Sequence, residues 1–184
     1  MKSGVVLRSE TGEPECVVLS PQNGVRIFLC IGVVETTVIE GFTFTGARDC
    51  SAMWCEDQAA PVIRRCMFRE NRSYFSGCAG GVTCWDSSPL LDHCVFEDNS
   101  AWTGPAGALS SVYSDVEVEY CTFLDNGEPA VEAATKGVVH AVRIAFPTHR
   151  PVEYLARVRD AVAILILHLE NVRDTVDDRS TIGR

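Results

Sequence analysis

Long apolar runs are missing from this 184-residue chain, and it contains no stretch of eighteen apolar residues. A helix that crosses a bilayer needs about 20 such residues, so the longest candidate, Ala161 to Leu167, predicts no membrane span. The first ten residues also lack the apolar core of a secretory signal peptide. Either the protein stays inside the cell, or the chain is part of a longer protein whose signal lies upstream.

Basic residues are also scarce, since 16 Lys and Arg stand against 25 Asp and Glu. The resulting net charge of −9 opposes the positive surface that phosphate backbones require, so we do not expect a nucleic-acid partner. The chain is 46% apolar and 22% charged, which suffices for a buried core and excludes wholesale disorder. Its length suits one domain, or one domain with an appendage.

Cysteine pairs at zinc-binding spacing are absent, although the chain has nine cysteines. The nearest pairs are Cys50 with Cys55 and Cys78 with Cys84, which are wider than the C-x2-C pattern of zinc sites. Several cysteines instead follow an internal repeat, and we interpret these as small buried apolar groups.

The chain repeats one phrase three times: a cysteine, a phenylalanine two residues later, and an asparagine three residues after that. Successive phenylalanines lie 28 and 27 residues apart, and an older copy ends at Phe44, with Phe42 at the cysteine position. Each unit holds short alternating runs broken by Gly, Asn, Asp, Ser and Pro, without room for the helix of a helical or leucine-rich repeat. The repeat therefore predicts a parallel β-helix with coils stacked about 4.8 Å apart.

Stacking of the coils predicts a role for each residue of the phrase. Residues i and i+2 of a strand face the same side, so cysteine and phenylalanine should form inward columns. Asparagine should turn a tight corner in the left-handed conformation and bond from coil to coil, and the glycines near residues 80 and 107 should mark another corner. Stacked thiols point the same way, which disfavours disulfides. The columns are Cys66, Cys94 and Cys121, then Phe68, Phe96 and Phe123, then Asn71, Asn99 and Asn126.

Phe-x-x-Asn alternating with Gly-Gly-Val-Thr at residues 80–83, or Gly-Ala-Leu at 107–109, resembles the right-handed parallel β-helix repeat family with the pectin-lyase-like fold. The chain is similar in particular to passenger repeats of polymorphic outer-membrane and autotransporter adhesins, and to bacterial secreted β-helix proteins. The resemblance covers about residues 4 to 130. It implies an all-β, right-handed parallel β-helix of about four to five coils, and it implies little about activity because the motif residues are structural.

The repeat phrase does not return after residue 130. Alternating apolar residues predict one more strand over 138–146. From Pro151 the apolar spacing changes to steps of three and four, which predicts an amphipathic α-helix over 152–176. We therefore divide the chain into a β-helix domain, 1–130, and a C-terminal part, 131–184. The helix would cap the solenoid, associate with a second copy, or be a tail foreign to the repeat.

Acidic residues form a further column, Glu70, Asp98 and Asp125, beside the asparagines, and Asp57 aligns with Asp86. Corner positions face water and prefer polar residues, which is the simplest interpretation. Carboxylates about 4.8 Å apart would also repel one another, so calcium is the cofactor that this column would suit. Catalysis by paired carboxylates is the third alternative. The lyase pattern Arg-x-Pro-x-x-Arg and the calcium nonapeptide are both absent.

Exposed aromatic residues are the candidate binding set: Trp54, Trp85, Trp102, Tyr74 and Tyr113. Aromatic side chains along one face of a solenoid suit sugar rings or a protein partner, whereas packing beneath loops is the alternative. Asn71-Arg72-Ser73 also matches a glycosylation acceptor.

The sequence is compatible with two functions. The first is a non-catalytic repeat segment of a secreted or surface bacterial protein, extracellular as part of a longer chain, which contacts carbohydrate or a surface protein in adhesion. The alternative is a polysaccharide lyase or glycoside hydrolase of the same fold. We favour the first because no complete catalytic set is present.

Overall fold

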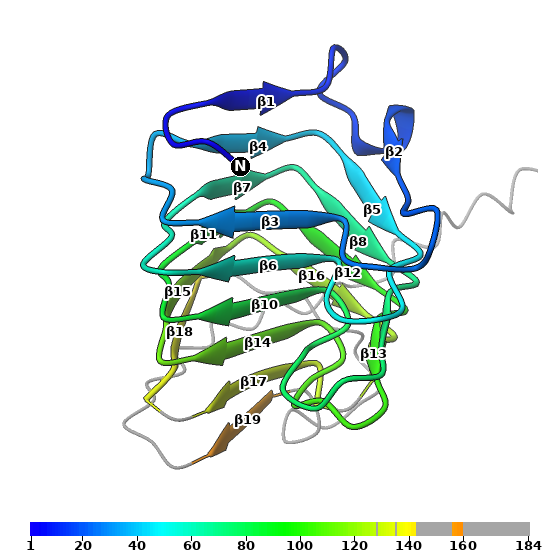
Figure 1. Ribbon diagram of the computed structural model, residues 1–184, viewed down its shortest axis with the longest axis vertical. Coiled ribbons are helices and arrows are strands. Elements are labelled where there is room, and N and C mark those ends of the chain that lie inside the picture. The colour runs from blue at the N-terminus through cyan, green and yellow to red at the C-terminus, as the bar shows by residue number, and fades with distance from the viewer. Residues whose placement is uncertain (128, 135, 143–155, 160–184) are drawn as a thin grey trace, which may run out of the picture.

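The chain folds as an all-β parallel solenoid, shown by the computed structural model in Figure 1. The structure describes residues 1–127, 129–134, 136–142 and 156–159. Two six-stranded sheets and one five-stranded sheet form its walls, with every neighbouring pair of strands parallel. A small fourth sheet has two strands.

The chain passes through the sheets in a fixed order, so neighbours in a sheet come from successive coils. The first sheet contains β1 (Val6–Arg8), β4 (Val38–Glu40), β7 (Val62–Arg64), β11 (Leu90–Asp92), β15 (Asp115–Glu119) and β18 (Val138–Val142). The second contains β2 (Val18–Leu19), β5 (Thr43–Thr45), β8 (Met67–Arg69), β12 (Val95–Glu97) and β16 (Thr122–Leu124). The third contains β3 (Phe28–Ile31), β6 (Met53–Glu56), β10 (Val82–Trp85), β14 (Leu109–Val112), β17 (Val131–Ala134) and β19 (Ala156–Arg159). The small sheet pairs β9 (Arg72–Ser73) with β13 (Ser100–Ala101), and a short 3-10 helix spans Pro14–Cys16.

A column of phenylalanine rings runs through the core. Phe68 pairs in register with Phe96, and Phe96 with Phe123, so the rings lie directly over one another. Their centroids are 5.0 and 4.8 Å apart, with interplanar angles of 11° and 3°. Each ring is fully buried or nearly so, which contributes roughly 1.5–3 kcal/mol of hydrophobic stabilisation per residue.

The cysteines of the repeat line the core as free thiols, which confirms the prediction of unpaired cysteines in this column. Each thiol also donates to two carbonyl groups of the first sheet, one in its own coil and one in the preceding coil. Cys94 Sγ, for example, lies 3.4 Å from the Ile63 carbonyl oxygen of the preceding coil and 3.5 Å from that of Asp92. Burial raises the pKa of Cys66 and Cys94, so both remain protonated donors.

The corners are made by residues other than those predicted. The left-handed conformation belongs to the residue before each asparagine, with φ of 55° at Glu70, 52° at Asp98 and 49° at Asp125. A second corner, between the first two sheets, places Arg65, His93 and Tyr120 at φ of about 50°. The prediction that asparagine itself adopts this conformation is wrong, because no asparagine of the column has a positive φ. The asparagine side chains instead lie buried and bond from coil to coil.

The glycines near residues 80 and 107 lie at bends just before β10 and β14, as predicted, although none of Gly80, Gly81 and Gly107 has a positive φ. A Cβ atom on Gly81 would lie 2.5 Å from the carbonyl oxygen of Ala108. At these bends the glycines allow close approach of successive coils, and a left-handed conformation is not what requires them.

Strands continue beyond residue 130, because β17, β18 and β19 extend the first and third sheets. Residues 143–146 of the predicted strand lie outside the described residues. Within the predicted helix, 152–176, only Ala156–Arg159 is described, and it is a strand paired with β17. Its alternating sequence, Ala-Arg-Val-Arg, suits a strand as well as a helix. Across the described part of the chain, no helix has the length and hydropathy needed to span a membrane.

Candidate binding groove

The asparagine ladder forms the floor of the candidate site. Asn99 Nδ2 donates to Asn126 Oδ1 at 3.0 Å and to the Phe68 carbonyl oxygen at 2.8 Å. Asn71 Nδ2 donates in the same way to Asn99 Oδ1 and to the Phe44 carbonyl oxygen, both at 3.0 Å. Asn71 and Asn99 are fully buried, so the ladder is a rigid, satisfied base rather than a set of free ligands.

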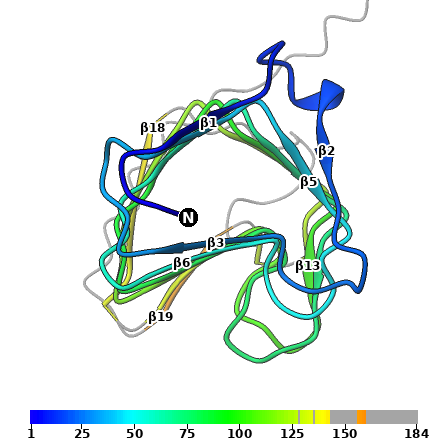
Figure 2. The same cartoon turned by 45° about the horizontal axis from the view of Figure 1, so that its top comes forward.

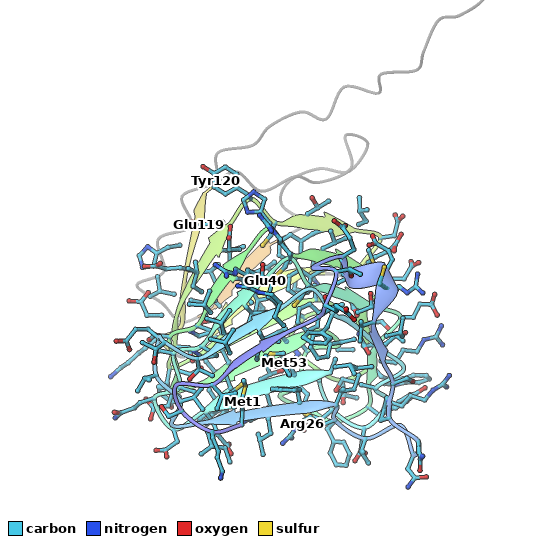
Figure 3. The ribbon with its side chains drawn as sticks, turned by 90° about the horizontal axis from the view of Figure 1, so that it is seen from above. Met1, Arg26, Glu40, Met53, Glu119 and Tyr120 are labelled. Atoms are coloured by element: carbon cyan, nitrogen blue, oxygen red, sulfur yellow. A yellow bond between two sulfur atoms is a disulfide. The ribbon has the colours of Figure 1, made fainter. Side chains whose placement is uncertain are left out.

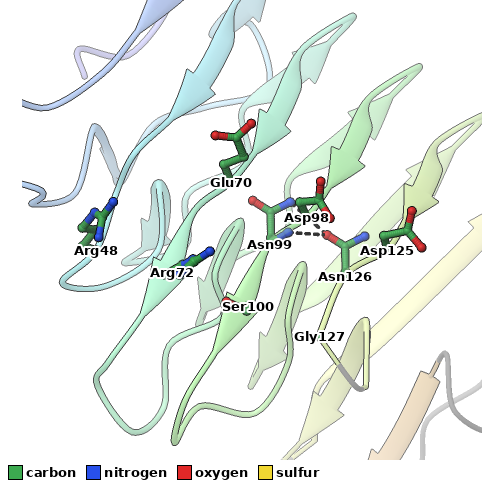
Figure 4. A pocket seen from close by; sticks show the side chains of 9 residues that line it. All are labelled: Arg48, Glu70, Arg72, Asp98, Asn99, Ser100, Asp125, Asn126 and Gly127. Carbon is green, nitrogen blue, oxygen red and sulfur yellow. Dashed lines mark hydrogen bonds between the residues drawn. The ribbon is translucent and has the colours of Figure 1, made fainter.

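A groove of about 860 Å³ follows this ladder across several coils (Figure 4). Its lining residues are Arg48, Glu70, Arg72, Asp98, Asn99, Ser100, Asp125, Asn126 and Gly127. The acidic side chains directly follow the strands of the second sheet, whereas Arg72 and Ser100 come from β9 and β13. The acidic residues are themselves the left-handed corner. After each of them the chain turns, and Arg72 and Ser100 follow two residues later.

Charges of both signs meet in the groove without neutralising one another. Within residues 1–127 and the other described segments, none of its three carboxylates and two guanidinium groups forms an ion pair. The three carboxylates of Glu70, Asp98 and Asp125 share one wall, and the arginines lie toward the N-terminal coils (Figure 4). Such a site offers hydrogen-bond acceptors and donors to a polar ligand.

The same carboxylates were the calcium candidates, and the structure places them in one column along the groove. Among the described residues, no three His, Cys, Asp or Glu side chains are grouped closely enough to hold a metal ion. The geometry thus supplies no calcium cage here.

Two of the candidate aromatic residues adjoin the groove. Tyr74 follows β9 and Trp102 follows β13, and the backbone N–H of Trp102 donates to the Ser73 carbonyl at 2.8 Å, which continues the pairing of these strands. Side chains two residues apart share a face, so Tyr74 lies on the side of Arg72, and Trp102 on that of Ser100. The rings are 6.4 Å apart, and Trp102 is 82% exposed. The aromatic pair therefore extends the groove wall outward.

The other three aromatic candidates lie elsewhere. Trp85 and Tyr113 contact each other edge to face at 5.6 Å, at the corner after β10 and β14, and both are exposed. Asp57 and Asp86 occupy the same corner at φ of 58° and 46°. Trp54 is half-buried, because Arg26 covers its ring at 4.9 Å and Glu56 accepts its indole N–H. The five aromatic residues thus divide into two pairs and a packed tryptophan.

A disulfide between Cys50 and Cys78 joins the loops beside the groove, and the sequence did not reveal it. Cys50 lies three residues before β6, and Cys78 lies four residues before β10, so the two cysteines do not share a repeat position. Loop 46–52 also carries Arg48, and loop 74–81 begins at Tyr74. In Figure 2 two green loops project from the solenoid beside β13.

The glycosylation motif at Asn71 is blocked in the folded protein. Its side-chain nitrogen, the atom that would carry a glycan, is buried and donates two hydrogen bonds within the ladder. Glycosylation at this position would require the ladder to open.

A second cluster of charges surrounds Glu40, on the first sheet (Figure 3). The carboxylate is 4% exposed and accepts from Arg8 at 2.6 Å and from Arg64 at 2.9 Å, with Arg65 at 3.6 Å. Burial alone would raise the pKa of Glu40, but the hydrogen bonds and charges of Arg64 and Arg8 outweigh it and hold the pKa below its usual value. The three arginines thus link β1, β7 and the corner after β7 to the buried carboxylate.

A scan against protein-family models finds no match, and searches of curated proteins and of solved structures find none either. A function must therefore be inferred from the groove and from the exposed side chains of the chain itself.

Proposed function

We propose that this chain is a non-catalytic β-solenoid segment of a secreted or surface protein, and that it contacts carbohydrate through the groove and the adjoining Tyr74–Trp102 pair. The observation that carries the proposal is that the exposed rings of Tyr74 and Trp102, 6.4 Å apart, each come two residues after a groove residue, Arg72 or Ser100. A pyranose ring has an apolar face that packs on an aromatic ring, and its hydroxyl groups bond to carboxylate and guanidinium groups.

The charges of the groove favour a neutral glycan over a polyanionic one. Three carboxylates exceed two arginines there, and the whole chain carries −9, so a uronic polymer would meet net repulsion. The solenoid repeats its side chains about every 4.8 Å, which suits an extended oligosaccharide.

Contact is favoured over catalysis because of where the carboxylates lie. A glycosidase holds two carboxyl groups on either side of the scissile bond. Here Glu70, Asp98 and Asp125 follow equivalent strands of the second sheet, and the lining residues from β9 and β13 are Arg72 and Ser100, neither of them a carboxylic acid. A lyase or hydrolase of the same fold stays the alternative function, since the groove does hold acidic groups.

The resemblance to adhesin passenger repeats supports the cellular setting of the proposal. The Cys50–Cys78 disulfide fits an oxidising, extracytoplasmic environment. We also take the solenoid to be right-handed, because parallel crossover connections almost always have that hand. The resemblance of the repeat phrase supports the pectin-lyase-like form of this fold.

An oligosaccharide array tests this function. Cellohexaose, mannohexaose, chitohexaose and oligogalacturonate would be immobilised and probed with the purified protein and with Trp102→Ala and Trp85→Ala. We expect binding to a neutral hexasaccharide that Trp102→Ala abolishes and Trp85→Ala, at a different corner, retains. Binding to none of the glycans would overturn the proposal. Release of reducing or unsaturated sugars from these oligosaccharides would instead establish the lyase or hydrolase, provided that Asp98→Ala abolishes the release.

A further inference from the structure

We infer that the Cys50–Cys78 disulfide positions the side chains that line and flank the groove, so that glycan binding is tighter when this bond is oxidised. The inference rests on the proposed function and adds its regulation. The disulfide spans 28 residues of sequence and links loops of adjacent coils.

The first linked loop, 46–52, leads from β5 to β6 and carries Arg48, two residues before Cys50. Its start is anchored to the asparagine ladder, because the Ala47 N–H donates to Asn71 Oδ1 at 3.1 Å. The Ala47 carbonyl accepts from the N–H of Arg72 at 2.8 Å. The backbone N–H groups of Arg48 and Asp49 both donate to the Gly24 carbonyl oxygen of the preceding coil. The disulfide adds an anchor at Cys50, on the far side of Arg48 from the ladder.

The second linked loop, 74–81, begins at Tyr74 and reaches Cys78 four residues later. The side chains from Tyr74 to Gly77 are all exposed, so burial does little to order this part of the loop. The disulfide then joins the end of this exposed part, at Cys78, to Cys50 of the preceding coil.

A third loop, 102–108, rests on the second at the disulfide. The approach is so close that a Cβ atom on Gly104 would lie 1.9 Å from the Cys78 carbonyl oxygen. Thr103 Oγ1 also donates to the Tyr74 carbonyl at 3.2 Å. Trp102 opens this loop. The segments that carry Arg48, Tyr74 and Trp102 are therefore held by backbone pairing on one side and lead toward the disulfide on the other.

Reduction would uncouple these loops. A dithiol such as dithiothreitol breaks the S–S bond by supplying two electrons and two protons, which leaves thiols on Cys50 and Cys78 and converts the dithiol to its cyclic disulfide. The strands and the asparagine ladder do not contain this bond. Binding should then carry the added cost of ordering three side chains, and the affinity should fall roughly tenfold.

The test compares the oxidised protein with Cys50→Ser/Cys78→Ser, using Cys16→Ser as a matched control because Cys16 is an exposed free thiol. The probe is the neutral hexasaccharide, cellohexaose, mannohexaose or chitohexaose, that the oxidised protein binds most tightly. Kd is measured by calorimetry at 10 °C, after circular dichroism has been used to check that each variant is folded at that temperature. We expect roughly tenfold weaker binding for the double variant and unchanged binding for the control. A lower melting temperature with unchanged Kd would mean a merely structural bond and would overturn the inference.

Hydrogen exchange on the wild-type protein provides a second measurement if the double variant does not fold. Brief reduction should increase exchange in loops 46–52, 74–81 and 102–108 while β8 and β12 stay protected, and reoxidation should restore both protection and affinity. Unchanged loop exchange, or equal loss of protection in the strands, would contradict a local positioning role. If the oxidised protein binds no glycan, the proposed function fails; if oxidised and reduced protein bind equally, only the present inference fails.

Discussion

Asn99 and Asn126 are joined by two hydrogen bonds to one atom: Asn126 Oδ1 accepts from the side chain of Asn99 at 3.0 Å and from its backbone N–H at 3.1 Å. The same relationship joins Asn71 to Asn99 one coil earlier. Each asparagine side chain thus bonds two backbone groups of the preceding coil, and the ladder couples the stacking of coils to the shape of the groove above it.

Replacing Asn99 with aspartate should therefore destabilise the protein strongly. The substitution removes the two hydrogen bonds that the Asn99 amide donates, to the Phe68 carbonyl oxygen and to Asn126 Oδ1, and it introduces a buried charge. We expect a loss of at least about 3 kcal/mol in the free energy of unfolding. Urea denaturation measures it, with Asp98→Asn, one residue away and exposed, as the control that should change by less than about 0.5 kcal/mol. A loss below 1 kcal/mol for Asn99→Asp would show that the ladder contributes little.

The corner before the ladder predicts an unusual order of substitutions. Glu70 has φ of 55°, a conformation that glycine adopts freely and valine resists. Glu70→Gly should be more stable than Glu70→Val by at least about 1 kcal/mol. The neighbouring strand residue Arg69 lies in β8, where β-branched residues are favoured, so Arg69→Val should be more stable than Arg69→Gly. Thermal or urea unfolding of the four variants measures their stabilities. If glycine and valine ranked the same way at Glu70 and at Arg69, the assignment of the corner to Glu70 would be contradicted.

The strands of this solenoid could be predicted from sequence because their side-chain period is two and their register repeats. Phe68, Phe96 and Phe123 occupy equivalent places in the phrase, and stacking of equivalent residues needs no further information. The corners were harder, because the phrase contains both an acidic residue and an asparagine and its pattern does not say which one has positive φ. In the structure the asparagine is buried and the exposed acidic residue has the positive φ. Which of the two is buried depends on contacts with the neighbouring coils.

The groove and its disulfide could not be predicted, because they depend on loops whose lengths vary between coils. The acidic column was visible in the sequence, but the approach of Arg48 to it was not. Cys50 and Cys78 are displaced by one residue relative to the paired strands that follow them, so no repeat position marks them as partners.

Stability should fall in acid through Glu40. The arginines around this carboxylate hold its pKa below the ordinary value of 4.5 in the folded state, whereas the unfolded chain has the ordinary value. The unfolded state then binds a proton first, so the contribution of Glu40 is present above about pH 4.5 and is lost as the pH falls through the lower folded pKa. Urea midpoints from pH 7 to pH 2.5 should decline more steeply for the wild type than for Glu40→Gln. Glu117→Gln, at an exposed position of the same sheet, should keep the wild-type slope.

Close contact between coils restricts substitution of the repeat glycine Gly81. An alanine Cβ would lie 2.5 Å from the Ala108 carbonyl oxygen and 3.0 Å from Phe96 Cδ1, so both the backbone and the phenylalanine column would have to move. Overpacking of this kind costs about 1–3 kcal/mol, and Gly81→Ala should lower the urea midpoint accordingly. Gly127→Ala is the matched control, because its Cβ would find its nearest neighbour at 3.4 Å and the residue has no positive φ. Equal stability of the two variants would show that successive coils can separate without cost, contrary to the packing described above.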